Sequence, residues 1–262
     1  ATVFPGANDC GLPAVQGTYL LCDGKTGQLK AMLDGTMLTA RRTAAASALA
    51  ASYLARDDAS VMVMAGTGAL APHLVEAHCS IRPIRKLYVW GLDLGDTKRI
   101  VSGWSIPDGV EVECIGELES VVREADLISC ATLAEDPLVR GDWLKPGAHL
   151  DLVGAFKPTM RESDDQTVMR SDVYVDTREG TLKEAGDLLQ PMSKALFAPD
   201  DIIADLFELC SGMVSGRTDE KVITLYKSVG ASLMDLAAAE MVVASLAIAG
   251  LDHKQNNQYL GE

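Results

Sequence analysis

The chain has 262 residues, of which 48% are hydrophobic, and its 23 lysines and arginines stand against 37 aspartates and glutamates, a formal net charge of −14. This acidic surplus argues against nucleic acid and anionic membrane surfaces as partners, because such polyanions are bound through basic patches and the chain has no basic run. The length favours one large or two modest domains, with enough apolar core to fold without disulfides.

Cysteine and histidine usage predicts a cytoplasmic protein without a metal. The six cysteines are scattered without a C-x-x-C pair, as in a reduced compartment. The histidines have neither metal-ligand nor triad spacing; they are His73, His78, His149 and His253. The first residues lack the basic and apolar regions of a signal peptide. Because they include no initiator methionine and begin with a strand-like tripeptide, we expect an upstream segment to be missing.

The first predicted elements are a hairpin and a helix. Strands at 19–22 and 29–33 flank a turn whose glycines can adopt positive φ. Residues 39–56 contain eight alanines, a composition that favours a helix, and place Arg41 and Arg42 in its first turn.

From residue 60 onward, strand and helix signals alternate. Apolar strands are predicted at 61–64, 87–90, 110–112, 127–128, 149–153 and 173–175. Helices are predicted up to His78, around Thr97 and at 118–124. This alternation is typical of a parallel sheet with crossover helices, and it predicts an α/β fold of the doubly wound Rossmann type.

The last third of the chain is predicted to end in helices. Residues 202–209 and 233–249 are expected to be helical, with a strand at 222–226 between them. The stretch 236–251 contains Glu240 and is shorter than the roughly 20 apolar residues of a membrane span. It therefore predicts a buried helix and no membrane partner.

A glycine-rich motif follows the strand at 61–64. The run Gly66-Thr67-Gly68-Ala69-Leu70-Ala71 has the pattern G-x-G-x-x-A and opens the next helix. The first glycine permits a tight turn, the second lets the backbone approach a pyrophosphate, and the helix N-terminus attracts phosphate. A second strand ends near Asp93, about where a ribose-binding acid is expected. A glycine turn in a sheet without nucleotide would not explain why these landmarks coincide.

The choice between NADH and NADPH stays open. Asp93 would accept hydrogen bonds from the free ribose hydroxyls of NADH and repel the 2′-phosphate of NADPH. Lys98 and Arg99 lie about one turn further along and could compensate that phosphate, or they could form a solvated helix face.

Several runs along the chain are distinctive in their residues and in their order. They are 38–47 (Leu-Thr-Ala-Arg-Arg-Thr-Ala-Ala-Ala-Ser), 66–69, Ala131-Thr132 with Pro137, 143–149 (Trp-Leu-Lys-Pro-Gly-Ala-His), 153–155 with Pro158 and Arg161-Glu162, and 227–230 (Lys-Ser-Val-Gly). In this order and spacing they resemble the ornithine cyclodeaminase and mu-crystallin family, over nearly the whole chain from Phe4 to Ala249.

The resemblance implies a homodimer that binds NADH or NADPH. It implies a dinucleotide-binding Rossmann domain at 58–227 and a discontinuous α+β substrate and dimerisation domain at 1–57 and 228–262. The family's leading segment supplies a further substrate-binding arginine and a lysine, which have no counterpart here, so we expect this second domain to be incomplete at its N-terminus.

The expected cofactor contacts come from the glycine motif, the carboxyl ends of strands and the family pattern. They are Thr43, Gly66, Thr67, Gly68, Ala69, Leu70, Asp93, Ala131, Thr132, Val153, Gly154, Ser228 and Gly230. Thr43 could instead contact substrate or bond its own helix backbone, and Gly230 could be a turn before the last helix.

One position divides the activities of the family. The cyclodeaminases carry an aspartate after the Val-Gly-Gly or Val-Gly-Ala turn, where this chain has Phe156. Phenylalanine cannot act as acid or base, so catalysis needing proton transfer there would lose about 10²- to 10⁴-fold. A phenyl ring forms an apolar wall that suits a cyclic substrate. The tract at 153–162, with 175–180 and 184–188, resembles reductases of Δ1-pyrroline-2-carboxylate and Δ1-piperideine-2-carboxylate.

The resemblance therefore predicts NADH- or NADPH-dependent reduction of a small cyclic imino acid. Arg42 matches the family's Arg-Thr-Ala position and is the expected anchor of the substrate carboxylate, with a surface arginine as the alternative. Gln16 would face the substrate by the same analogy, and the proton donor is unassigned. Three other functions stay open: ornithine cyclodeaminase, alanine dehydrogenase, and a non-catalytic binding protein like mu-crystallin.

Overall fold

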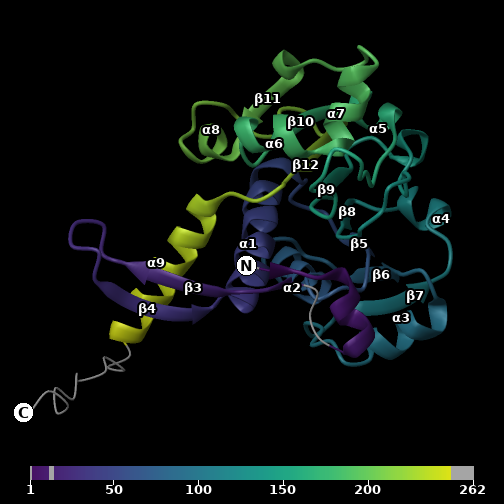
Figure 1. Cartoon of the computed structure of the whole chain (residues 1–262). Coiled ribbons are helices and arrows are strands. Elements are labelled where there is room, and N and C mark those ends of the chain that lie inside the picture. The colour runs from purple at the N-terminus through teal and green to yellow at the C-terminus, as the bar shows by residue number, and fades with distance from the viewer. Residues whose placement is uncertain (1, 12–14, 249–262) are drawn as a thin grey trace, which may run out of the picture. The chain divides into compact units, whose positions relative to one another are not determined.

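A computed structural model of the chain describes residues 2–11 and 15–248 (Figure 1). These residues form two compact units. One is the segment Thr43–Ala231, and the other combines the described residues before Thr43 with those after Ala231.

The segment Thr43–Ala231, which is described throughout, contains an eight-stranded sheet. Neighbouring strands are parallel and follow the order β11-β10-β12-β9-β8-β5-β6-β7, from top to bottom in Figure 1. The strands are β5 (Val61–Ala65), β6 (Lys86–Trp90), β7 (Glu111–Ile115), β8 (Leu127–Cys130), β9 (His149–Leu152), β10 (Ser171–Val175), β11 (Ile202–Asp205) and β12 (Ile223–Lys227).

The strand order reverses beside β5. From β5 the chain proceeds outward through β6 and β7, and then crosses to the other side of β5 with β8 and β9. This reversal is the switch point of a doubly wound sheet, beside which ligands bind at the carboxyl ends of the strands. The α/β fold of Rossmann type predicted from the sequence is confirmed.

Short helices connect the parallel strands. They are α2 (Ala71–Ile81), α3 (Leu94–Val101), α4 (Glu119–Val122), α5 (Asp165–Met169), α6 (Arg178–Glu184), α7 (Gly186–Ser193) and α8 (Leu206–Cys210), with 3-10 turns η2 (Gly141–Trp143) and η3 (Pro199–Asp201).

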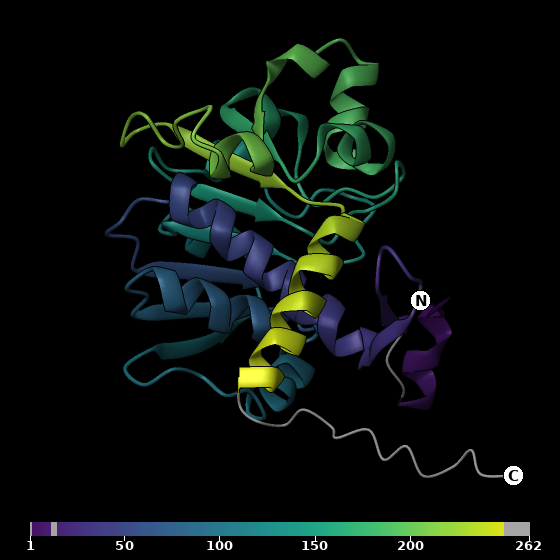
Figure 2. The same ribbon diagram turned by 90° about the vertical axis from the view of Figure 1, so that its left-hand side faces the viewer.

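Both faces of the sheet are covered by apolar side chains. Met62 and Met64 of β5 pack in one cluster with Ala51 of α1 (Gly35–Leu54) and Leu74 of α2. Figure 2 shows α1 lying across this face. The alternate residues Val63 and Ala65 pack in the cluster on the other face. A strand buried on both faces is a continuous apolar run, which explains why β5 is easy to predict.

The other unit has small antiparallel sheets and one long helix. It contains β1 (Thr2–Val3), η1 (Pro5–Cys10), β2 (Val15–Gln16), the predicted hairpin of β3 (Thr18–Cys22) and β4 (Leu29–Asp34), the start of α1, and α9 (Ser232–Ile248). Leu21, Leu38 and Ala239 form its buried core.

The units divide at Thr43 because Ala44 and Ala51 of α1, and Ala55 just after it, pack on the large sheet. The domain boundaries at 57/58 and 227/228 stay a prediction. In the described part of the chain, no helix has both the length and the apolar character to cross a membrane.

The prediction of a helix at 202–209 is wrong. Residues Ile202–Asp205 form the edge strand β11, paired in parallel with β10, and only Leu206–Cys210 are helical. Ile202 and Ala204 are buried while Ile203 is exposed, which is the two-residue period of a strand. Asp205 then starts α8 through a capping box with Glu208.

Two details of the predicted helices are also corrected. Helix α1 starts at Gly35, where Asp34 Oδ1 accepts hydrogen bonds from the N–H groups of Thr36 and Met37, so Arg41 and Arg42 lie beyond its first turn. Helix α9 was expected to be buried, yet most of its described side chains are exposed and only Ala239 is fully buried among them. Residue 249 and His253 lie outside the described residues.

Candidate functional site

The candidate site lies at the carboxyl edge of the large sheet. Because its strands are parallel, the segments after β5, β6, β8, β9 and β12 all emerge at this edge. They carry most residues predicted to contact a cofactor: Gly66, Thr67, Gly68, Ala69, Leu70, Asp93, Ala131, Thr132, Val153, Gly154, Ser228 and Gly230. The structure therefore places segments that are far apart in sequence at one edge, beside the switch point.

The glycine-rich loop fits a bound pyrophosphate. Gly66 has φ +121° and donates its N–H to the carbonyl of Trp90 at 2.9 Å, and a Cβ there would lie 2.5 Å from the carbonyl oxygen of Ala131. Gly68 is exposed, and a Cβ there would meet no atom within 4 Å. Helix α2 begins just after it, and its N-cap Leu70 offers no side-chain acceptor to the helix N–H groups. The N–H groups of Ala71 and His73 bond the carbonyls of Gly68 and Leu70, and Pro72 has no N–H, so the donors for an anion would come from the loop before the helix.

Asp93 stands at the carboxyl end of β6, where a ribose would be recognised. It is the N-cap of α3, and its Oδ1 accepts a hydrogen bond from the N–H of Asp96 at 2.8 Å. Arg99 is paired with Asp96 at 2.9 Å. The charge of Arg99 is therefore partly neutralised within its own helix.

A buried carboxylate that the site prediction omitted joins two of the edge loops. Glu162 is completely buried, and its Oε1 accepts hydrogen bonds from the N–H of Thr132 at 2.6 Å and from the Thr132 hydroxyl at 2.8 Å. Its Oε2 accepts from the N–H of Gly154 at 2.8 Å. The loop after β8 and the loop after β9 are thus held by one side chain.

A second carboxylate does the same for the loop after β12. Oδ2 of Asp176, at the end of β10, accepts hydrogen bonds from the Ser228 hydroxyl at 3.0 Å, from the N–H of Val229 at 2.9 Å and from the N–H of Gly230 at 2.6 Å. Gly230 adopts φ +92°, a conformation that favours glycine. Asp176 therefore fixes a turn at Gly230.

An ion pair lies beneath these loops. Nζ of Lys227 is 3.1 Å from Oδ2 of Asp187, and both side chains are fully buried. Oδ1 of Asp187 accepts hydrogen bonds from the N–H groups of Glu162 and Ser163. Burial raises the pKa of Glu162 to about 7, while the charge of Lys227 opposes this shift and that of Asp187 adds to it. Glu162 thus changes its charge near neutral pH.

The predicted substrate residues lie in both units. On α1, Arg42 donates from Nε to Oδ1 of Asp235 at 2.8 Å within its own unit, which orients the guanidinium, and Thr43 is half-buried. Gln16 is exposed on β2. Phe156 is half-buried two residues after Gly154, and the ammonium of Lys157 lies 5.9 Å from the centre of its ring.

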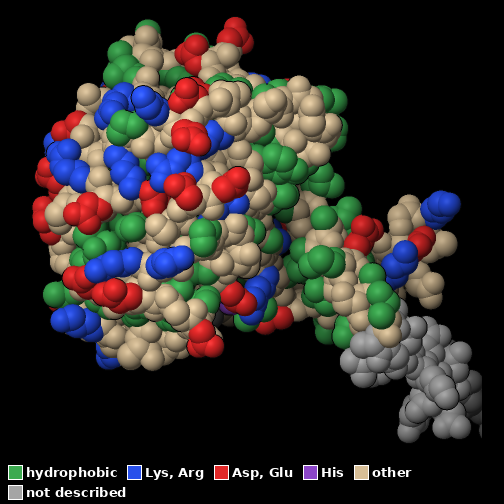
Figure 3. Space-filling model, turned by 180° about the vertical axis from the view of Figure 1, so that it is seen from behind, with side chains coloured by type: hydrophobic (Ala, Val, Ile, Leu, Met, Phe, Trp, Pro, Cys, Tyr) green, Lys and Arg blue, Asp and Glu red, His purple; other side chains and the backbone are tan. Residues whose placement is uncertain are grey.

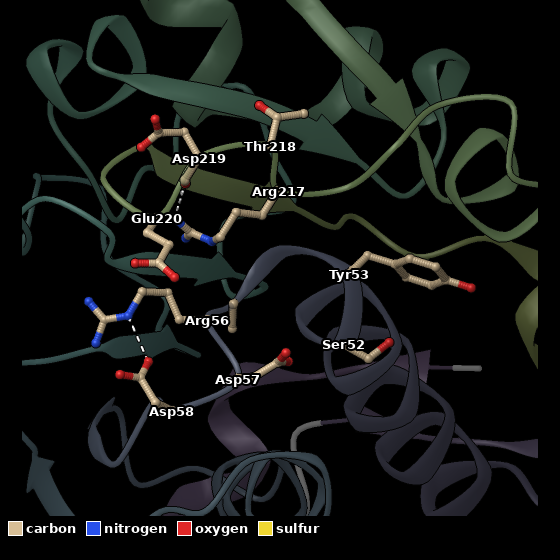
Figure 4. A pocket seen from close by; sticks show the side chains of 10 residues that line it. Ser52, Tyr53, Arg56, Asp57, Asp58, Arg217, Thr218, Asp219 and Glu220 are labelled. Atoms are coloured by element: carbon tan, nitrogen blue, oxygen red, sulfur yellow. Dashed lines mark hydrogen bonds and ion pairs between the residues drawn. The ribbon is translucent and has the colours of Figure 1, made fainter.

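A cavity of about 520 Å³ lies away from these residues, near the amino ends of β5 and β12 (Figure 4). Its arginines serve the fold: Arg217 donates to the carbonyl of Leu54, and Arg56 pairs with Asp58 and Asp126. The cavity belongs to the opposite edge of the sheet from the candidate site.

Comparison with known proteins identifies the family. Residues 1–248 match the ornithine cyclodeaminase/mu-crystallin family. The chain belongs to this family. The family membership predicted from the sequence runs is confirmed.

Three similar proteins match this chain over most of their length. The Δ1-pyrroline-2-carboxylate reductase of Paracoccus denitrificans is 36% identical over 249 residues, which cover 94% of this chain and 78% of that protein. The structure of the Δ1-pyrroline-2-carboxylate reductase of Thermococcus litoralis in complex with NADH and L-proline has a TM-score of 0.90 and 34% identity, covering 95% of this chain and 77% of that one. An archaeal alanine dehydrogenase dimer with bound NAD has a TM-score of 0.86 and 27% identity, covering 95% and 76%.

The sequence analysis named residues of the edge loops, but it did not name the side chains that hold these loops together. Glu162 appeared only as part of a run of family resemblance, and Asp176, Asp187 and Lys227 were given no role. The sequence feature that could have indicated such side chains was an acidic residue in an otherwise apolar or glycine-rich run near the end of a strand. Such a residue needs several donors when it is buried, and here the donors are backbone N–H groups of the site.

Proposed function

We propose that the chain is an NADH- or NADPH-dependent reductase of cyclic imine carboxylates, which converts Δ1-pyrroline-2-carboxylate to L-proline and Δ1-piperideine-2-carboxylate to L-pipecolate. The observation that carries this proposal is the open glycine loop at the switch point in a chain that resembles a reductase solved with NADH and L-proline. When bound, the dihydronicotinamide supplies a hydride to the carbon of the C=N bond.

The edge loops would hold the cofactor. The backbone from Gly66 to Leu70, at the N-terminus of α2, would bind the pyrophosphate, and Asp93 would accept hydrogen bonds from the adenosine ribose. The remaining loops would contact the nicotinamide half through Ala131, Thr132, Val153, Gly154, Ser228 and Gly230. Holding the ring and the imine face to face is the main contribution of such residues, worth about 7–11 kcal/mol in favourable cases.

Arg42 would bind the substrate carboxylate. Its Nε is engaged by Asp235, and the two terminal nitrogens of a guanidinium remain suited to a bidentate pair. Phe156 would line the hydrocarbon side of the ring, with Gln16 and Thr43 as further contacts. A phenyl group at position 156 favours reduction over ornithine cyclodeamination, because it cannot carry a proton.

We also propose a homodimer. Large apolar side chains are exposed along α9, including Leu233, Met241 and Ile248, and on the hairpin, including Leu20 and Met32. Hydrophobic side chains are frequent on this part of the chain in Figure 3, with a few acidic and basic groups among them. A patch of this kind on one copy suits a second copy of the same chain. Light scattering should give twice the chain mass, and Met241→Glu should lower it; a monomer would contradict the proposal.

The reaction is tested by adding cyclic imine to the chain with NADH or NADPH in a buffer free of ammonia. Loss of the reduced nicotinamide absorbance with formation of L-proline supports imine reduction. Turnover only with pyruvate and ammonia would indicate alanine dehydrogenase. Ammonia release from L-ornithine would indicate cyclodeamination, and cofactor binding without any turnover would indicate a binding protein.

A further inference from the structure

Glu162 lies where two of the proposed nicotinamide-binding loops meet. A Cβ added to Gly154 would be 2.2 Å from both the nitrogen and the carbonyl oxygen of Thr132, and 2.3 Å from Oε1 of Glu162. The two loops and the carboxylate therefore touch so closely that only glycine fits at position 154. The position of one loop fixes that of the other.

Only a carboxylate satisfies the donors at this point. Oε1 faces the N–H and the hydroxyl of Thr132, and Oε2 faces the N–H of Gly154. A glutamine has one acceptor oxygen and one NH₂ group. In either orientation of its amide, the NH₂ would face a backbone N–H at hydrogen-bond distance, so one donor would be left opposed by another.

The titratable groups around Glu162 come from three elements. Lys227 of β12 and Asp187 of α7 form the buried ion pair, and their charges offset each other. Cys130 at the end of β8 stays a neutral thiol, since burial raises its pKa well above the usual range. The neighbouring Arg161 points elsewhere, to the carbonyl of Ser163 and to Asp165. The remaining stabilisation of a charged Glu162 is supplied by the hydroxyl and N–H groups of the two loops.

We propose that Glu162 is a positioning residue for the cofactor: its carboxylate holds the Thr132 and Gly154 loops at the spacing that the nicotinamide half requires. The proposal rests on the proposed function, because it assumes that a reduced nicotinamide binds at this edge. Glu162 itself has no exposed surface, so it acts through the loops.

Protonation should weaken this arrangement. A neutral carboxyl group can donate its proton to the hydroxyl oxygen of Thr132, but the oxygen that carries the proton is then a poor acceptor for the N–H of Thr132. Because the pKa of Glu162 is raised to about 7 by burial, the affinity for NADH should fall as the pH is lowered through this value.

The test compares Glu162→Gln with Asp126→Asn. Asp126 is also buried and accepts two backbone N–H groups, those of Ser60 and Val61, but at the amino edge of the sheet. NADH affinity is measured by fluorescence titration between about pH 6 and pH 8.5, and the melting temperature of each variant is recorded. We expect about tenfold weaker NADH binding for Glu162→Gln at pH 8, unchanged binding for Asp126→Asn, and a pH dependence in the wild type that Glu162→Gln lacks.

Glu162→Gln that binds NADH as the wild type does, with the same pH profile, would overturn the proposal. If that variant fails to fold, the wild-type profile decides, and an affinity that is constant or rises as the pH falls from 8 to 6 would overturn it. A wild-type chain that binds neither NADH nor NADPH would instead refute the proposed function itself.

Discussion

Gly68→Ala separates what the fold needs from what a ligand needs. An added Cβ at Gly68 meets no atom within 4 Å, and the residue is not among those with positive φ. At Gly66 the same change meets the carbonyl oxygen of Ala131 at 2.5 Å, with φ at +121°. The folded chain therefore requires glycine at 66 but not at 68. A glycine at 68 is explained by a group that approaches the backbone from outside.

The two substitutions should differ in sign for stability. Replacing a glycine whose conformation alanine can adopt stabilises a protein by about 0.4–1 kcal/mol, through the lower entropy of the unfolded chain. Gly68→Ala should thus melt at the wild-type temperature or slightly above it. Gly66→Ala should lose about 1–3 kcal/mol from backbone strain alone, before the contact with Ala131 is relieved.

Cofactor binding should show a loss at Gly68 despite the intact fold. A methyl group forced into a packed contact typically costs about 1–3 kcal/mol, so the Kd for NADH should rise about 5- to 150-fold. Fluorescence titration with NADH and differential scanning fluorimetry on the same samples measure both quantities. Gly68→Ala with wild-type NADH affinity, or with a stability loss like that of Gly66→Ala, would refute the assignment of this loop to pyrophosphate.

Three further predictions concern single side chains. Asp93→Asn keeps an N-cap for α3 but removes the charge that would repel a 2′-phosphate. The ratio of kcat/KM for NADPH to that for NADH should therefore rise about tenfold, and an unchanged ratio would contradict the role of Asp93. Phe156→Ala should raise the KM for the cyclic imine about fivefold and leave the NADH affinity unchanged, because a half-buried ring contributes about 1 kcal/mol. A shift in NADH affinity instead would place Phe156 at the cofactor. Asp126→Asn should lower the free energy of unfolding at pH 7 by about 1–3 kcal/mol, because Ser60, Val61 and Lys145 lose a charged acceptor. Burial alone would raise the pKa of Asp126, but its hydrogen bonds to these groups hold that pKa below the usual 3.8. The charged Asp126 therefore stabilises the fold above about pH 4, and this stabilisation is lost as the pH falls further. The difference in urea unfolding between variant and wild type should shrink below about pH 4, and a constant difference would contradict this account.

The sequence predicted best where structure is decided locally. Strand β5 is an apolar run followed at once by a glycine motif and a helix, so the pattern, the turn chemistry and the helix start agree within Val61–Ala71. The edge strand β11 is only Ile202–Asp205, and the helix-forming residues after it hide the boundary between strand and helix in the sequence pattern. Its strand conformation depends on pairing with β10, which no local pattern shows.

The side chains that hold the site could not be predicted for a related reason. Glu162 lies 30 positions from Thr132 in the chain, and Ser228 lies 52 positions from Asp176. Their hydrogen bonds exist only once the parallel strands are in register. The sequence predicted a buried helix at α9 because its composition is apolar, but composition does not show whether another part of the chain covers the helix.

The most direct test of the proposed reaction is the oxidation of NADH by the wild-type chain with Δ1-pyrroline-2-carboxylate in ammonia-free buffer, alongside Arg42→Ala. The proposal predicts that the reduced nicotinamide absorbance falls as one L-proline forms per NADH consumed. It also predicts that Arg42→Ala keeps its NADH affinity and loses turnover. Oxidation that requires ammonia and pyruvate, or turnover that survives in Arg42→Ala, would contradict it.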